Sequence, residues 1–141
     1  MTRLRLGPVT IHFASKDGGP ESRVFMYGVE CKAVGSAVAL RFENGSRETF
    51  HSHAFNALSW VLSGRLEEYS LHHGPALQYV ETTVLTPGAR PVRTARDRCH
   101  MVVSTGRSWA LSFRGPWAET WFEVTPGGTE TVLECGRKVV S

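Results

Sequence analysis

The sequence has few cysteines and no long apolar run. Its three cysteines, Cys31, Cys99 and Cys135, are far apart and form no C-x-x-C pair. This spacing predicts neither a zinc ribbon nor a disulfide framework, and reduced thiols in a reducing compartment are the simplest interpretation. No segment approaches the roughly 20 apolar residues of a membrane helix, and the first residues lack the apolar core of a signal peptide. We therefore expect a cytoplasmic protein with a single domain over residues 1–141.

Lysine is also scarce, so the net charge of +3 comes mostly from arginine. Nucleic acid, anionic substrates or a genome rich in arginine codons could each account for this balance, and we favour the last. The arginines at 90, 93, 96 and 98 form the most plausible phosphate-binding cluster. No recognition-helix pattern or stacking motif accompanies them, so nucleic-acid binding is the weakest of the functions considered.

No segment shows the pattern of a long helix. Glycine (14) and proline (7) are spread along the chain, with short β-branched or aromatic runs between them. That distribution is typical of an all-β protein, either a sandwich or a closed barrel. We predict eleven strands, at residues 9–14, 23–29, 37–43, 49–55, 58–63, 66–71, 78–84, 100–104, 109–114, 120–124 and 130–133.

The sequence lacks a Ser-His-Asp order, a P-loop and a dinucleotide-binding glycine pattern. Its most informative stretch is residues 50–64, FHSHAFNALSWVLSG. Residues i and i+2 of a strand point to the same face, so His51 and His53 would project together and could bind one cation. Taken alone, the pair is weak evidence for a metal site, and two solvated histidines on a surface strand are the favoured explanation.

This stretch resembles the first motif of the cupin superfamily, G-x5-H-x-H-x3/4-E-x6-G, through His51, His53 and Gly64. A Pro-Gly turn at residues 87–88 and then His100 resemble the second cupin motif. The segments 41–42, 51–64, 99–102 and 109–116 are similar, in order and spacing, to a subgroup of small bacterial and phage cupins. The resemblance covers about residues 41–122 and implies a double-stranded β-helix, which is one form of jelly-roll barrel.

The chain departs from the cupin motif at its carboxylate. The usual glutamate falls at Ala57, which cannot bind a metal, and the aspartate of the subgroup falls at Asn56. The resemblance therefore implies a site of three imidazoles, His51, His53 and His100. Such a site suits a divalent ion, Fe, Ni, Zn or Mn, with positions left open for water or substrate. Sites of three histidines resemble those of the thiol dioxygenases within the cupins.

The resemblance implies a metal-dependent activity on a small molecule, as a dioxygenase or as a metal-assisted lyase or isomerase. The alternative is a non-enzymatic barrel that holds a small ligand or a structural ion. Arg41 and Arg114 are candidate anchors for an anionic substrate, and Asn56 is a further candidate for substrate binding. A homodimer is the expected assembly, because cupins often pair through sheet edges.

Other titratable residues carry weaker signals. One of Glu67 and Glu68 must face the interior of its strand, where it could act as a general base or a stray ligand. We expect His12 on the solvent side of its strand, and the pair His72 and His73 in a solvated loop.

Overall fold

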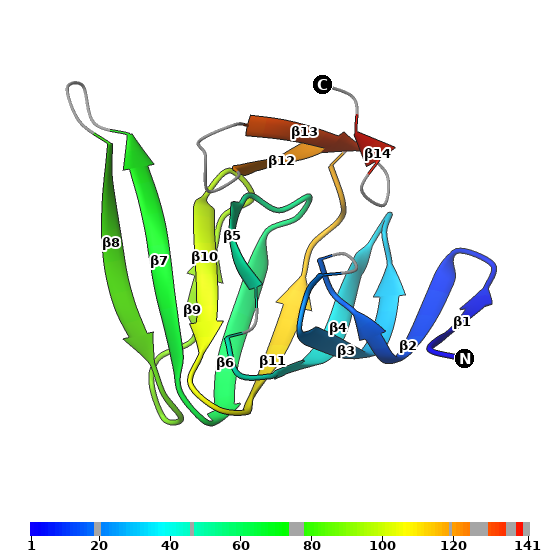
Figure 1. The fold of residues 1–141 in the computed structure, drawn as a ribbon. Coiled ribbons are helices and arrows are strands. Elements are labelled where there is room, and N and C mark those ends of the chain that lie inside the picture. Colours follow the sequence, from blue (N-terminus) through cyan, green and yellow to red (C-terminus); the bar gives the residue numbers. More distant parts are fainter. Residues whose placement is uncertain are drawn as a thin grey trace.

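The structure is a computed structural model that describes residues 1–18, 21–45, 47–73, 78–118, 120–124, 130–134 and 138–139. Within these residues the chain forms fourteen strands and no helix. The described part of the chain therefore offers no helix that could span a membrane. The strands make two seven-stranded sheets, and every strand pair is antiparallel. Figure 1 shows the two sheets enclosing a jelly-roll barrel, which confirms the predicted all-β fold class.

The order of strands in each sheet is as follows. The first sheet runs β1 (Arg3–Leu6), β2 (Val9–Lys16), β3 (Val24–Cys31), β4 (Gly35–Phe42), β11 (Ser108–Arg114), β6 (Ala57–Ser63) and β9 (Val92–Thr94). The second runs β14 (Lys138–Val139), β13 (Glu130–Glu134), β12 (Thr120–Val124), β5 (Arg47–His51), β10 (Cys99–Ser104), β7 (Leu66–His73) and β8 (Gln78–Leu85). Neighbours such as β4 and β11 are far apart in sequence, so the barrel depends on long-range pairing.

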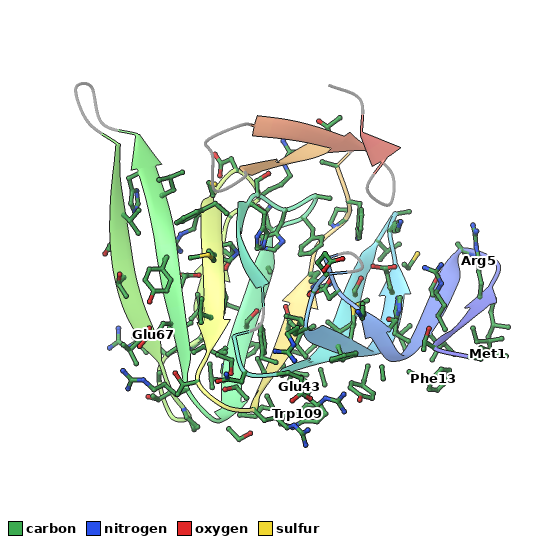
Figure 2. All side chains as sticks on the ribbon, in the orientation of Figure 1. Met1, Arg5, Phe13, Glu43, Glu67 and Trp109 are labelled. Atoms are coloured by element: carbon green, nitrogen blue, oxygen red, sulfur yellow. The ribbon has the colours of Figure 1, made fainter. Side chains whose placement is uncertain are left out.

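The core lies between the two sheets, where alternate residues of each strand point inward. Seven buried side chains form it: Val24, Met26, Val38, Leu40, Phe42, Leu66 and Ala110. Full burial of a large apolar side chain contributes about 1.5–3 kcal/mol. The opposite faces of β3, β4 and β11 point away from the barrel. Figure 2 shows Phe13 and Trp109 on this outer side, away from strands β12–β14.

All eleven predicted strands are present, with ends displaced by a few residues. The largest error is at 49–55, because β5 ends at His51 and residues 52–55 bend away from the sheet. Strands β1, β9 and β14 were not predicted, since they have only four, three and two residues, too few to show a period. Cys135 lies outside the described residues.

The prediction for His12 is wrong. Its side chain is buried, with Nδ1 2.6 Å from the hydroxyl of Ser15 and Nε2 3.4 Å from the carboxylate of Glu30. The neighbouring Phe13 is 51% exposed instead, so the polar residue and not the apolar one faces inward. A register shift at Ala14, whose φ is 59°, brings Ser15 onto the same face as His12.

Candidate metal centre

The three histidines come from β5, from the turn that follows it, and from β10. His51 is the last residue of β5 and pairs directly with His100 of β10. His53 lies beyond the end of the strand, so the same-face argument from the sequence does not explain its position. Its backbone N–H instead donates to the carbonyl oxygen of Arg96 at 3.2 Å. This bond fixes the turn against the loop that leads to His100.

The three imidazoles converge. One nitrogen from each ring lies within 4.8 Å of the others, and the ring centroids are 4.8, 4.9 and 5.0 Å apart. His51 and His100 are buried and His53 is half-buried. The Nε2 atoms of His53 and His100 are 2.7 Å apart. Two nitrogen lone pairs do not face each other at this distance, so either one nitrogen carries a proton or both face a cation. The donor set therefore fits a divalent ion.

A buried carboxylate supports His100 from the neighbouring strand. Glu68 of β7 is 4% exposed, and its Oε2 accepts a hydrogen bond from Nδ1 of His100 at 2.8 Å. Its Oε1 lies 3.4 Å from the guanidinium of Arg98. Burial alone would raise the pKa of Glu68. The His100 hydrogen bond and the positive charges of His100 and Arg98 outweigh burial, and they lower this pKa below its ordinary value of 4.5. Glu68 is therefore ionised at neutral pH.

The histidines open into a cavity of about 120 Å³ between the two sheets. A cavity of about 150 Å³ can hold benzene, so the volume suits a small molecule. Most of the wall is apolar, from core residues of β3, β4, β6 and β10. Ala57, at the sequence position of the cupin motif's glutamate, also lines the cavity. The polar groups of the wall, apart from the histidines, are Asp17, Ser59, Glu68, Thr94, Ser112 and Arg114.

Arg114 brings a buried positive charge to this cavity. Its side chain is 4% exposed, and Nη2 donates to Oδ2 of Asp17 at 2.6 Å. Its Cζ lies 4.6 Å from the ring centroid of Phe55, which in turn stacks on His53 at 5.1 Å. The Nε of Arg114 has no hydrogen-bond partner among the described residues. The guanidinium therefore lies one aromatic ring away from the histidines, and one of its buried donors is unpartnered among the described residues.

The other two candidate substrate residues lie outside the cavity. Arg41 extends from β4, where its Nε lies 2.9 Å from Glu43 and its Nη1 donates to the hydroxyl of Tyr27 at 2.8 Å. Asn56 is exposed, and its Oδ1 accepts from the backbone N–H of Arg96 at 2.7 Å. Asn56 therefore acts together with the His53 backbone to hold the Arg96 loop in place.

The remaining titratable residues are separate from the three histidines. His72 lies on β7 and contacts Glu81 of β8 at 3.1 Å, so it is in a strand and not in the expected loop. The side chain of His73 lies outside the described residues. Of the arginine cluster, Arg98 turns toward Glu68, and the side chains of Arg90, Arg93 and Arg96 are exposed.

No protein-family model matches this sequence, and no curated protein does. Solved structures do share its fold. A cupin superfamily protein from Desulfitobacterium hafniense has a TM-score of 0.51 at 13% identity, over 71% of this chain and 84% of its own. Oxalate oxidase in complex with glycolate has a TM-score of 0.52 at 14% identity, over 72% of this chain and 55% of its own.

A third similar structure contains a metal. It is HEPD from Streptomyces albus with its substrate 2-hydroxyethylphosphonate and Fe(II) bound, with a TM-score of 0.55 at 12% identity. The match covers 79% of this chain but 24% of that protein. At such identities the likeness concerns the fold alone. The chain has the cupin fold, as the sequence motifs predicted.

Proposed function

We propose that this protein is a metal-binding small cupin that acts on a small anionic molecule inside its barrel. The observation that carries the proposal is the convergence of His51, His53 and His100 in the wall of a mostly apolar cavity. We further propose that residues 1–141 form a single cytoplasmic domain.

His51, His53 and His100 would hold the ion, which could be Fe, Ni, Zn or Mn. Held by three neutral nitrogens, such an ion supplies Lewis-acid chemistry or an O₂-binding centre, because it keeps its full charge and open coordination positions. The apolar wall of the cavity keeps bulk water away and strengthens electrostatic interactions inside it.

Arg114 would anchor the anionic group of the substrate. A guanidinium offers donors in a fixed fork that suits carboxylate or phosphate. Arg114 lines the cavity, and its buried Nε has no hydrogen-bond partner among the described residues. Its bond to Asp17 takes one nitrogen and holds the guanidinium in place. Two proteins of the same fold were solved with small anions, glycolate and 2-hydroxyethylphosphonate. Arg41 and Asn56 are left out of this proposal because they lie outside the cavity.

Two reaction classes are compatible with this site, a dioxygenase and a metal-assisted lyase or isomerase. Oxygen consumption separates them. Protein reconstituted with Fe(II) is offered small thiols and small carboxylic acids while dissolved O₂ and products are measured. Turnover that consumes O₂ supports a dioxygenase, and turnover without O₂ loss supports a lyase or isomerase. Ligand binding without turnover supports the alternative, a non-enzymatic binding barrel.

A matched pair of variants tests the anchor. Arg114→Met should weaken binding of small carboxylates to the metal-loaded protein, because it removes the buried charge. Arg93→Met is the control, since Arg93 is exposed at the surface. Equal carboxylate affinity in the wild type and both variants would contradict the role of Arg114.

We also propose a homodimer formed through the outer face of the first sheet. Apolar side chains continue across four strands in register, as in the row Tyr27, Ala39, Leu111 and Trp60. A parallel row contains Val29 and Phe113, which are 48% and 46% exposed. A large continuous apolar patch usually marks an interaction surface. This face carries little charge, so a second copy related by a two-fold axis would meet an equally apolar surface.

A further inference from the structure

Glu68 reaches His100 although it is not the residue of β7 that lies directly opposite it. The residue of β7 directly opposite His100 is Ser70, whose side chain is too short to reach around the imidazole. Glu68 is two residues away on the same face, opposite Val102. A long side chain can reach a diagonal neighbour on an adjacent strand. Glu68 does so, and places Oε2 2.8 Å from Nδ1 of His100.

We infer that Glu68 is the positioning residue of this metal centre: it holds His100 in the tautomer that presents Nε2 to the ion, and it supplies the negative charge that Ala57 does not. This inference rests on the proposed metal-binding function. In the cupin motif that this chain resembles, the carboxylate belongs among the metal ligands. In this chain the negative charge would come from Glu68 on β7 and would act on the ion through the imidazole of His100.

The tautomer follows from the acceptor. An ionised carboxylate can only accept hydrogen bonds, so Nδ1 of His100 must carry the proton. With Nδ1 committed to the carboxylate, Nε2 is the ring nitrogen left to face an ion, and it lies 2.7 Å from Nε2 of His53. A carboxylate behind a metal-bound imidazole also increases the basicity of the ligand.

The second carboxylate oxygen of Glu68 contacts a partly exposed arginine. Arg98 approaches Oε1 at 3.4 Å and is 31% exposed. Both carboxylate oxygens therefore have a partner, which keeps the side chain in one orientation although it is buried. Glu67, the neighbour on the same strand, points the other way and contacts Tyr69 and Arg65 at 2.8 and 3.5 Å. Glu67 is thus a matched control with the same side chain and no contact with His100.

The first measurement uses the metal-free wild type and needs no variant. Nitrogen-15 NMR of the histidine rings reports which nitrogen of each imidazole carries the proton. We expect a proton on Nδ1 of His100. A His100 ring protonated at Nε2 alone would overturn the inference, whatever the metal affinity turns out to be.

The second measurement compares Glu68→Gln with Glu67→Gln by titrating zinc against a competing chelator. Loss of the carboxylate behind a ligand typically weakens metal binding about 10- to 100-fold, so we expect this loss in Glu68→Gln only. The visible spectrum of the cobalt-loaded protein should change in the same variant. Equal affinities and spectra in both variants would overturn the inference. Absence of zinc binding in the wild type would instead overturn the proposed function, and the NMR result would still decide the tautomer.

Discussion

Gly64, which ends the first cupin-like motif, should tolerate no side chain. It forms the turn between β6 and β7 with φ of +86°. A Cβ added there would lie 2.3 Å from Oγ of Ser108 and 2.7 Å from both its Cα and the carbonyl oxygen of Arg107. Ser108 is fully buried, and its hydroxyl bonds to Ser104 and to the backbone of Arg65. The clash therefore falls on backbone atoms and on a side chain that cannot move away.

The cost of Gly64→Ala has three parts. The left-handed conformation costs an alanine about 1–2 kcal/mol, overpacking costs about 1–3 kcal/mol, and each disturbed hydrogen bond of Ser108 costs about 1 kcal/mol. We expect a total loss of about 3–6 kcal/mol in the free energy of unfolding. With an unfolding entropy of about 2.1 cal/mol/K per residue, this lowers the melting temperature by about 10–20 °C.

Gly88→Ala is the control that separates strain from clash. Gly88 also has a left-handed φ, +82°, but a Cβ there would meet nothing within 4 Å. It should lose only the conformational part, about 1–2 kcal/mol. Thermal and urea unfolding of the two variants and the wild type give the comparison. If both variants lose the same stability, the close approach of the Gly64 turn to Ser108 is not what makes glycine necessary there.

Three further predictions concern charge, ligand number and assembly. The pKa of Glu68 is lowered on folding, so the stability that its charge contributes is present above pH 4.5 and is lost as pH falls through the folded pKa. If the difference in unfolding free energy between metal-free wild type and Glu68→Gln does not change with pH, this prediction is contradicted. Ala57→Glu should tighten zinc binding by adding an anionic oxygen to three neutral nitrogens, and unchanged affinity would mean that residue 57 does not face the ion. Phe113→Lys should give monomers in light scattering, whereas Val84→Lys, similarly exposed at 44% on the other sheet, should not; a monomeric wild type would refute the dimer.

The sequence was sufficient for the strands and for two of the three histidines. His51 and His100 lie on predicted strands. These strands, β5 and β10, pair so that the two histidines are directly opposite each other. His53 lies near the other two histidines, but not because it shares a strand face with His51. It lies in a turn that is held by a hydrogen bond to the Arg96 backbone. A bend of this kind depends on a hydrogen bond to a loop some forty residues later, which local periodicity does not reveal.

Only the three-dimensional structure shows which of the candidate charged residues point into the barrel. Both faces of the strand around Arg41 are largely apolar, so the sequence could not tell the barrel interior from the outer face. The pairing of β4 with β11 places Arg41 outside and Arg114 inside. Alternation from Leu66 does indicate that Glu68 and not Glu67 points inward. Its contact with His100 depends on the register between β7 and β10, which is set by long-range pairing.

The metal content of the purified protein tests the central claim most directly. Protein prepared without a histidine tag and reconstituted with zinc or Fe(II) should hold one equivalent by elemental analysis. His51→Ala, His53→Ala and His100→Ala should each lose it, because two imidazoles do not hold the ion against a chelator. His72→Ala should retain it, since His72 contacts Glu81 on the neighbouring strand. A full equivalent of metal in His100→Ala would contradict the three-histidine site.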